Sequence, residues 1–440
     1  MNDPGLVRYT VNAGGALVGR LRVPGDKSIS HRVVMLGALA AGDSHAGGFL
    51  HSEDTRATIA AFRRMGVTIN AGDDGEIHIK GVGLRGLREP AAPLDLGNSG
   101  TSARLMTGLL AGQAFASDIT GDASLRRRPM NRVVEPLRQM GAHIEMSAGG
   151  TLPLHIDGAP LKGIDYTLPV ASAQLKSCLL LAGMYAGGDT VLHEPVATRD
   201  HTERMLAACG WPLERNTSGS LHISGGGELQ PFSLEIPADI SSAAFFLAGA
   251  SMAPGSKVLL ENVGVNPTRA AVIDILKMMG ADIEITGQRE LAGEPVADLQ
   301  VRYASLQGIE IPEALVPISI DEFPAILIAA ATAEGTTELR GAEELRVKES
   351  DRIQAMADGL NALGINAQVK AGGMVVHGGR LRGGRIDSHG DHRISMAFAM
   401  AALVADGPIV IDDCANVATS FPGFAGAARS LGLDIREETA

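Results

Sequence analysis

Two series of glycine residues, each with six members, divide this chain at a nearly regular interval. In both series an apolar or amphipathic, helix-like stretch precedes the glycine and an alternating, strand-like segment follows it. Glycine is favoured just after a helix because it adopts positive φ, so we expect each one at the C′ position. The first series steps by 70, 76, 67, 80 and 72 residues, at Gly42, Gly112, Gly188, Gly255, Gly335 and Gly407. The second steps by 75, 69, 70, 84 and 68 residues, at Gly66, Gly141, Gly210, Gly280, Gly364 and Gly432.

The interval predicts six copies of one α/β unit, each with two helices and several strands, because common solenoid repeats are shorter. The helices before the first series are apolar on all sides, as over residues 325–331 and 397–403, which predicts complete burial. The helices before the second series are amphipathic, with Ile273 and Leu276 on one face and Asp274 on the other. No apolar run reaches the roughly 18 to 20 residues that a membrane span requires.

Polar residues precede each of the all-apolar helices. These starts are Asp26-Lys27-Ser28, residues 98–102, Ser172-Ala173-Gln174, residues 239–242, residues 320–322 and residues 391–393. Helices that lie side by side would bring their positive dipole ends to one face, and two such faces would bind an anionic ligand. Capping alone explains the Ser, Asp and Asn residues. It does not explain the cations nearby, which are Lys27, Arg104, Arg128, Lys348, Arg352 and Arg393.

Composition narrows the class of partner. The net charge is −12 and only 3% of the residues are aromatic, which disfavours nucleic acid as a ligand. Cys178, Cys209 and Cys414 form no CxxC pair, and we interpret them as buried, reduced thiols of a cytoplasmic protein. The 12 histidines show no metal-ligand spacing, and the N-terminus has no signal or transit pattern.

We therefore predict an α/β fold with two domains, each made of three repeated units whose buried helices are covered by outer sheets. A hinge is expected where the chain crosses twice, near residues 23–25 and 236–239. Residues 1–23 and 239–440 would form a discontinuous first domain, and residues 24–238 the second. The N-terminal strand would then belong with the C-terminal half.

Four long motifs resemble the signatures of the 5-enolpyruvylshikimate-3-phosphate (EPSP) synthase family. They are Pro24–Arg32, Leu96–Thr101, Arg346–Arg352 and Gly390–Arg393, and the resemblance extends over nearly the whole chain. It implies a two-domain, inside-out α/β barrel fold and transfer of the enolpyruvyl group of phosphoenolpyruvate to the 5-hydroxyl of shikimate 3-phosphate. Phosphate is released on the route to chorismate and the aromatic amino acids. No metal, organic cofactor, nucleic acid or membrane is expected, and we expect a monomer.

The resemblance also assigns binding residues, and arginine forks suit the phosphate and carboxylate of each substrate. For shikimate 3-phosphate they are Lys27, Ser28, Arg32, Ser172, Ala173, Gln174, Arg199, Asp321 and Lys348. For phosphoenolpyruvate they are Lys27, Gly100, Arg128, Gln174, Arg352 and Arg393.

Carboxylates are needed to move protons in this reaction. The resemblance makes Asp321 the base for the 5-hydroxyl, Glu349 the group that exchanges a proton with the methyl carbon, and Lys27 the group that assists the departing phosphate. Simpler interpretations stay open for three of these segments. Asp321 can be only a helix cap, Lys348-Glu349 only a solvated helix start, and Asp391–Arg393 only a cap with structural ion pairs.

The chain departs from many family members at two positions, with Ala173 in place of a second serine and Ser420 in place of a lysine. Residues 128–130, 199–203 and 320–324 are similar to the divergent bacterial subclass that includes glyphosate-tolerant enzymes. That tolerant group carries alanine where this chain has Gly100. In this family glyphosate occupies the phosphoenolpyruvate site, so Gly100 predicts inhibition by glyphosate.

Two other functions are considered. UDP-N-acetylglucosamine enolpyruvyl transferases share the fold and chemistry, but they place a reactive cysteine in a loop where this chain has Asp122–Arg126 without one. A non-catalytic repeat protein that binds phosphorylated ligands would not need Asp321 and Glu349 beside the cations.

Overall fold

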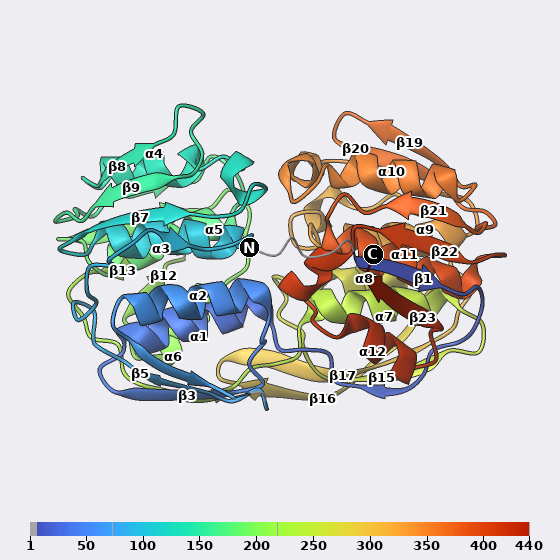
Figure 1. Cartoon of the computed structure of the whole chain (residues 1–440), viewed down its shortest axis with the longest axis horizontal. Coiled ribbons are helices and arrows are strands. Elements are labelled where there is room, and N and C mark those ends of the chain that lie inside the picture. Colours follow the sequence, from blue (N-terminus) through green and yellow to red (C-terminus); the bar gives the residue numbers. More distant parts are fainter. Residues whose placement is uncertain (1–6, 73, 218, 440) are drawn as a thin grey trace. The chain divides into compact units, whose positions relative to one another are not determined.

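The computed structural model describes residues 7–72, 74–217 and 219–439 (Figure 1). The described chain divides into two compact units. Unit 1 takes the chain up to Pro24, residues Pro237–Glu290 and the part from Pro295 onward. Unit 2 holds Gly25–Ile236 and the short segment Leu291–Glu294. The hinge near residues 23–25 and 236–239, and the domain limits expected from the sequence, stay predictions.

Unit 2 contains three four-stranded sheets with one topology. In each, the first strand runs parallel to the second, while the second, third and fourth alternate in direction. The first sheet is β14 (Ser233–Glu235), β3 (Asp43–Gly47), β5 (Ile77–Lys80) and β4 (Thr68–Ala71). The second is β6 (Leu94–Asp95), β7 (Ala116–Thr120), β9 (Leu154–Asp157) and β8 (His143–Met146). The third is β10 (Asp165–Thr167), β11 (Asp189–His193), β13 (Leu221–Ser224) and β12 (Leu213–Arg215).

Unit 1 repeats the pattern with three more sheets. The first is β16 (Asp282–Leu291), β17 (Glu294–Arg302), β15 (Lys257–Gly264) and β2 (Val18–Leu21). The second is β18 (Thr336–Leu339), β20 (Gly373–His377) and β19 (Asn366–Lys370), and isolated parallel bridges from Gln307 and Glu310 take the place of its fourth strand. The third is β21 (Gly384–Asp387), β22 (Ile409–Asp412), β1 (Val7–Val11) and β23 (Ile435–Thr439). The prediction of six α/β copies is confirmed.

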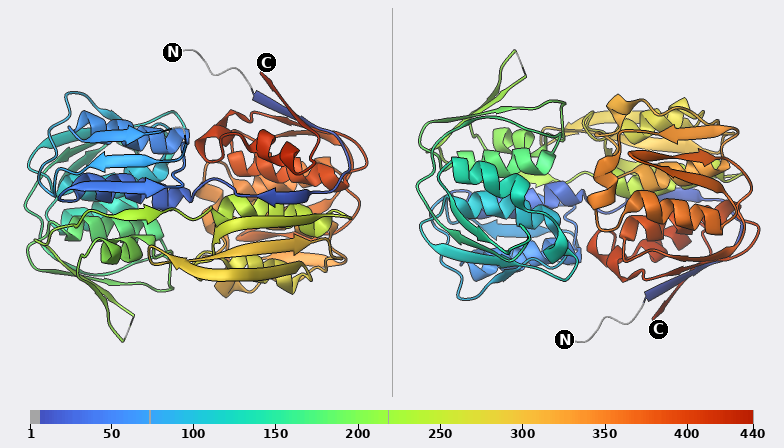
Figure 2. Two further views of the ribbon diagram at one scale, coloured as in Figure 1. Left: turned by 90° about the horizontal axis from the view of Figure 1, so that it is seen from below. Right: turned by 90° about the horizontal axis from the view of Figure 1, so that it is seen from above.

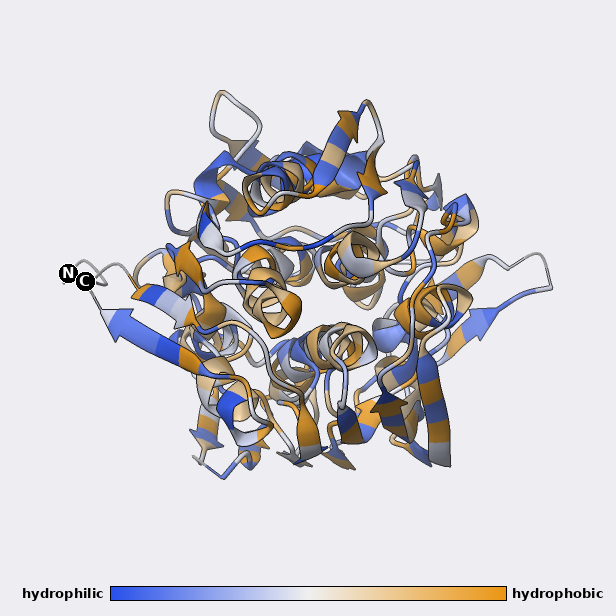
Figure 3. Cartoon of the chain, turned by 90° about the vertical axis from the view of Figure 1, so that its right-hand side faces the viewer, coloured by the Kyte–Doolittle hydropathy of each residue, from blue (hydrophilic) through white to orange (hydrophobic). Residues whose placement is uncertain are grey.

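The helices of each unit form an inner and an outer set. The inner helices are α1 (Lys27–Leu39), α3 (Gly100–Ala111) and α5 (Ala173–Gly183) in unit 2, and α7 (Ile240–Met252), α9 (Phe323–Thr332) and α11 (His392–Ala401) in unit 1. Every residue of α7 is buried, so the prediction of apolar, fully enclosed helices is confirmed. In Figure 3 the helices are mostly apolar in colour while the strands alternate, as expected for sheets with one face on a core.

The outer helices keep one exposed side. They are α2 (Glu53–Arg64), α4 (Asn131–Gln139), α6 (His201–Ala208), α8 (Ala271–Met278), α10 (Arg352–Ala362) and α12 (Phe424–Ser430). Each unit encloses its own hydrophobic core. Seen from below in Figure 2, strands of each unit lie over its helices. Within the described residues, no helix is long and apolar enough to cross a membrane.

The glycine prediction is confirmed for one series and wrong for part of the other. All six glycines of the second series follow the C-cap of an outer helix and have positive φ, as at Gly66 and Gly432. In the first series Gly112 is itself the C-cap, with φ −91°, and Gly407 has no positive φ. The inner helices α1, α7 and α9 pass directly into extended chain at their C-caps, so their glycines come later.

Candidate active site

The inner helices of unit 2 begin beside one another. Asp26, Ser99 and Ser172 cap α1, α3 and α5, and each side chain accepts a backbone N–H of the first turn. Gln174 connects two of these starts, because it accepts from Arg104 Nη1 at 3.0 Å and donates to Thr101 Oγ1 at 3.2 Å. The positive ends of these helices therefore share one face of unit 2, which we call the α1/α3/α5 face.

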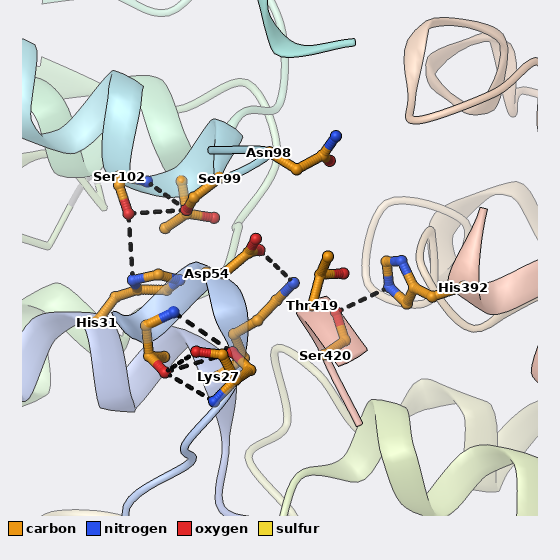
Figure 4. A network of polar contacts seen from close by, with 12 residues as sticks. Lys27, His31, Asp54, Asn98, Ser99, Ser102, His392, Thr419 and Ser420 are labelled. Atoms are coloured by element: carbon orange, nitrogen blue, oxygen red, sulfur yellow. Dashed lines mark hydrogen bonds and ion pairs between the residues drawn. The ribbon is translucent and has the colours of Figure 1, made fainter. Parts of the chain in front are cut away.

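Lys27 begins α1 and faces the start of the outer helix α2. Its Nζ lies 2.9 Å from Asp54 Oδ2, as Figure 4 shows, and its side chain is one-fifth exposed. Sequence analysis missed Asp54. The acidic first turn of α2 is an ordinary helix feature, and nothing in the spacing indicates that it meets Lys27.

Arg32 is buried in unit 2 and holds α1 against α5 and α6. Its Nε donates to Thr202 Oγ1 at 2.7 Å, and its Nη2 donates to Ser177 Oγ at 2.8 Å. Burial lowers the pKa of Arg32 to about 10, and the positive charge of Arg199 acts in the same direction. Glu203 and Asp26 oppose that shift. Two cations close enough to repel each other favour binding of an anion between them. Ser28 contributes its carbonyl oxygen to Arg32 Nη1 at 2.8 Å.

Gly100 begins α3 with two guanidinium groups over its α-carbon. A β-carbon placed there would lie 2.9 Å from Arg104 Nη1 and 3.1 Å from Arg128 Nη1. Arg128 donates from Nη2 to Asn98 Oδ1 at 2.7 Å and to Ser124 Oγ at 3.3 Å. The structure thus brings Gly100 and Arg128 together, and the amide oxygen of Asn98 and the hydroxyl of Ser124 orient the Arg128 guanidinium.

A chain of small polar groups lies beneath this face. His31 Nδ1 is 2.8 Å from Thr58 Oγ1, Thr58 Oγ1 is 2.6 Å from Ser102 Oγ, and Ser102 Oγ is 2.7 Å from Ser99 Oγ. Figure 4 shows His31, Ser102 and Ser99 in this order. Burial, then the charges of Lys27 and Arg32, lower the pKa of His31 to about 3, so the imidazole is neutral. The chain fixes the start of α3 relative to α1 and α2.

Unit 1 has a second polar face, where α7, α9, α10 and α11 begin, and Arg352 lies at its centre. The Arg352 side chain is almost fully buried, and its Nε donates to Asp391 Oδ2 at 2.8 Å. Nη2 donates to Glu349 Oε2 at 2.6 Å, and Nη1 donates to Asp321 Oδ1 at 3.1 Å. Burial alone would lower the pKa of Arg352, but Asp391, Glu349 and Asp321 together raise it. Three carboxylates thus share one guanidinium.

Asp321 also contacts a second cation. Lys348 Nζ lies 3.3 Å from Asp321 Oδ1, and Arg393 Nη1 donates to the Asp321 carbonyl at 2.9 Å. The interpretation of Asp321 as only a helix cap is wrong, because the N-cap of α9 is Glu322. No side-chain cap bond is made there, so our expectation of a capping side chain at this helix also fails. Asp391 does cap α11, accepting from Arg393 N at 2.9 Å.

A further ion cluster joins the helix starts of unit 1. Arg269 Nη2 donates to Ser241 Oγ at 2.7 Å and lies 3.4 Å from Asp239 Oδ1, while Ser241 also hydrogen-bonds Glu322. Sequence analysis missed Arg269 and Glu322 as partners of Ser241, because Arg269 lies 28 residues further along the chain and Glu322 comes from the next repeat. Ser420 stands where many family members have a lysine. Its Oγ lies 3.0 Å from His392 Nε2, and Figure 4 shows this contact.

Cysteine chemistry has no support among the described residues. Cys178, Cys209 and Cys414 are free and buried, as predicted. Burial raises the pKa of each thiol to about 12, so none is a ready nucleophile. Within the described ranges no group of three or more His, Cys, Asp or Glu residues could hold a metal ion.

The family model described as EPSP synthase (3-phosphoshikimate 1-carboxyvinyltransferase) matches residues 11–427. The chain belongs to the EPSP synthase family. It is 63% identical over 436 residues to the 3-phosphoshikimate 1-carboxyvinyltransferase of Methylococcus capsulatus, covering 99% of both chains. It is 61% identical over 429 residues to that of Nitrosococcus oceani, covering 97% of this chain and 96% of the relative.

Solved structures agree with this assignment. The EPSP synthase of Acinetobacter baumannii superposes with a TM-score of 0.88 at 51% identity, covering 98% of this chain and all of that one. The enolpyruvyl transferase NikO of Streptomyces tendae shares the fold, with a TM-score of 0.80 at 19% identity and 99% of this chain covered. The predicted family and the predicted fold class are confirmed, and the UDP-N-acetylglucosamine alternative is not favoured.

Proposed function

We propose that this protein transfers the enolpyruvyl group of phosphoenolpyruvate to the 5-hydroxyl of shikimate 3-phosphate and releases phosphate. Membership of the family supports the reaction. The observation in the structure that carries it is the Arg352 group of unit 1, where Asp321 and Glu349 lie beside Arg352 and Lys348. Two carboxylates held beside cations are what an addition–elimination on an anionic substrate requires.

In the addition step, the 5-hydroxyl oxygen bonds to C2 of phosphoenolpyruvate. Asp321 accepts the hydroxyl proton. Glu349, which is protonated at the start of this step, gives its proton to the methylene carbon. The product is a tetrahedral ketal. In the elimination step the bond between C2 and the phosphate oxygen breaks, and Glu349 takes a methyl proton back. Lys27 gives a proton to the leaving phosphate or stabilises its charge.

In this proposal, both units contribute ligands to each substrate. Lys27, Ser28, Arg32, Ser172, Ala173, Gln174 and Arg199 of unit 2, with Asp321 and Lys348 of unit 1, are our ligands for shikimate 3-phosphate. Lys27, Gly100, Arg128 and Gln174 of unit 2, with Arg352 and Arg393 of unit 1, are our ligands for phosphoenolpyruvate. The contacts of Arg128 with Asn98 and of Arg352 with three carboxylates support unequal roles for these two arginines.

We also propose that the protein acts in the cytoplasm as a monomer, without metal or organic cofactor, and that residues 23–25 and 236–239 serve as a hinge. The shared reaction class of its bacterial relatives and the helix finding reported above support the location.

Phosphate release from phosphoenolpyruvate tests the function directly. Purified protein is assayed with shikimate 3-phosphate, with UDP-N-acetylglucosamine, or with no acceptor, and the carboxyvinyl product is identified by mass spectrometry. We expect turnover only with shikimate 3-phosphate, and loss of turnover in Asp321→Asn. Turnover with the UDP-sugar would establish the alternative enzyme. Binding without turnover by either acceptor would indicate a phospho-ligand-binding protein.

A further inference from the structure

Behind Arg32 and Arg199, unit 2 contains a buried ion cluster that the mechanism above does not use. We call Lys176, Glu194, Glu203 and Arg215 the Lys176 cluster. Lys176 lies in the first turns of α5, and its side chain is completely buried. Its Nζ is 2.7 Å from Glu203 Oε1 and 3.0 Å from Glu194 Oε1. Arg215 Nη2 approaches the same two carboxylates at 3.4 and 3.6 Å, with its side chain 43% exposed.

The cluster anchors the turn that carries Arg199. Lys176 Nζ donates to the carbonyl oxygen of Thr198 at 3.2 Å. Glu194 Oε1 accepts from Thr198 N at 3.1 Å and from Thr198 Oγ1 at 2.6 Å. Thr198 is thus held on both sides of its backbone, and Arg199 is the next residue. The residue that precedes Arg199 is therefore held by charged groups on α5 and just after β11.

The same cluster lies directly behind the partners of Arg32. Ser177 follows Lys176 on α5, and Thr202 precedes Glu203 on α6. Their hydroxyl oxygens are 2.8 Å apart and both accept from Arg32. The ion pair from Lys176 to Glu203 thus joins the two helices one residue away from the two hydroxyls that orient Arg32.

Stability alone is a poor reason for this arrangement. A buried ion pair loses its hydration, and well-packed apolar side chains often replace such a pair at no cost in stability. Burial raises the pKa of Glu203 while Lys176 opposes that shift, which is the signature of a carboxylate held out of water. A charged group kept in this position points to a role in orientation.

We propose that Lys176 is a positioning residue for shikimate 3-phosphate, acting through Thr198 on Arg199 and through the α5–α6 contact on Arg32. The inference rests on the proposed function, in which Arg32 and Arg199 bind this substrate. It assigns to Lys176 an effect chiefly on this substrate, because the groups that the cluster holds are the neighbour of Arg199 and the hydroxyl partners of Arg32.

The test compares Lys176→Met with wild type in steady-state kinetics, varying each substrate separately. We expect KM for shikimate 3-phosphate to rise about tenfold or more, while KM for phosphoenolpyruvate and kcat change by less than about threefold. The second variant, Thr198→Val, keeps every charge and the side-chain shape but removes the side-chain hydrogen bond to Glu194, while the backbone N–H of residue 198 can still donate to it. It should raise the same KM by a smaller factor, about threefold.

Leu181→Ala is the matched control, because it truncates a buried side chain of the same helix and leaves the cluster intact. It should lower the thermal midpoint without a selective change in either KM. The inference is overturned if Lys176→Met raises both KM values equally, or if Leu181→Ala gives the same split. Should Lys176→Met not fold, an unchanged KM in Thr198→Val overturns it alone. Absence of turnover in the wild type would instead reject the proposed function.

Discussion

The polar faces of the two units treat their cations differently. In unit 2, Arg128 hydrogen-bonds Asn98, Arg104 hydrogen-bonds Gln174, and Arg32 hydrogen-bonds hydroxyl groups. In unit 1, Arg352 is held by three carboxylates, and Lys348 pairs with Asp321. The neutral groups named here orient the guanidinium groups of unit 2, whereas the carboxylates around Arg352 are themselves ordered by the cation that they share.

This contrast separates the main tasks of the two faces, while Lys348, Arg352 and Arg393 of unit 1 also serve as proposed ligands. The α1/α3/α5 face is suited to hold the phosphate and carboxylate groups of the substrates. The Arg352 group is suited to fix Asp321 and Glu349 for proton transfer. Lys27 differs from the arginines of the α1/α3/α5 face named above, because its ammonium lies 2.9 Å from the carboxylate of Asp54. That pairing is consistent with a group that acts on a leaving phosphate as well as binding it.

The largest effect is expected from the carboxylates of unit 1. Asp321→Asn and Glu349→Gln keep the shape of each side chain but remove the proton acceptor. We expect kcat to fall by about 10²–10⁴-fold in each, with much smaller changes in KM, because general acid–base groups contribute that much. Steady-state assays with both substrates measure this. If kcat is unchanged in both variants, the division between the units is wrong.

Stability should separate Arg352 from Arg128. Arg352→Met leaves Asp391 buried beside Glu349 and Asp321 without their shared cation, and breaking a buried ion pair in this way costs about 3–5 kcal/mol. Arg128→Met removes contacts with an amide and a hydroxyl, so the cost should be nearer to about 1–2 kcal/mol. Denaturant unfolding of both variants gives the two values. Equal losses would mean that the carboxylates of unit 1 do not depend on Arg352.

Measurements of substrate binding test the proposed role of Arg128. Arg128→Met should raise KM for phosphoenolpyruvate by about 10–150-fold, the value of a hydrogen bond to a charged group, with a smaller change in kcat. Arg126→Met is the control, since Arg126 lies in the same 3-10 turn, Leu125–Arg127, and is exposed. The two variants are compared at one ionic strength. A KM effect of similar size in Arg126→Met would make it a general charge effect.

The neutral histidine beneath the α1/α3/α5 face predicts a dependence of stability on pH. The folded pKa of His31 is lowered from 6.5 to about 3, so the unfolded state takes up a proton first as the pH falls. The contribution is complete above pH 6.5 and is lost below it, at about 1.4 kcal/mol for each pH unit. Denaturant unfolding at pH 7, 6 and 5 should show a shallower decrease in His31→Asn. Parallel curves for the two proteins would contradict this assignment.

The sequence predicts the repeated elements well because they are local. Six C′ glycines, the all-apolar inner helices and the polar helix starts are each visible within a few residues. The first glycine series is partly misplaced, since Ala40 and Ala333 end their helices in extended backbone that needs no glycine. That choice depends on where the next strand joins its sheet, which a local pattern does not contain.

Partners contributed by different helices could not be found in this way. Asp54 meets Lys27 and Glu203 meets Lys176 only because helices from separate parts of the chain begin side by side. Arg269 is the clearest case, because an isolated arginine at a turn carries no signal, yet it contacts Asp239 and Ser241. Glu349 lies in the motif over residues 346–352 and Asp321 in the segment 320–324, and only the resemblance to the family assigned a role to either.

The smallest expected effect concerns Gly100. The motifs of the bacterial subclass are typical of glyphosate tolerance, whereas Gly100 predicts inhibition. A methyl group at this position lies within 2.9 Å of Arg104 Nη1 and 3.1 Å of Arg128 Nη1, so both guanidinium groups must move. Both are ends of flexible side chains, and the movement should be tolerated by the fold. It takes space from the proposed phosphoenolpyruvate site, and glyphosate is the longer molecule, so glyphosate should lose more affinity.

We therefore expect the wild type to be inhibited by glyphosate competitively with phosphoenolpyruvate. Gly100→Ala should raise the inhibition constant several-fold more than it raises KM for phosphoenolpyruvate. Arg104→Lys serves as the matched variant, because it shortens one of the two displaced side chains while leaving the α3 start unchanged. In the double variant that combines Gly100→Ala with Arg104→Lys, the shorter side chain at residue 104 leaves room for the methyl group. Part of the lost glyphosate affinity should therefore return. Equal factors for the two constants, or a wild type indifferent to glyphosate, would show that groups other than Gly100 determine the length of the site.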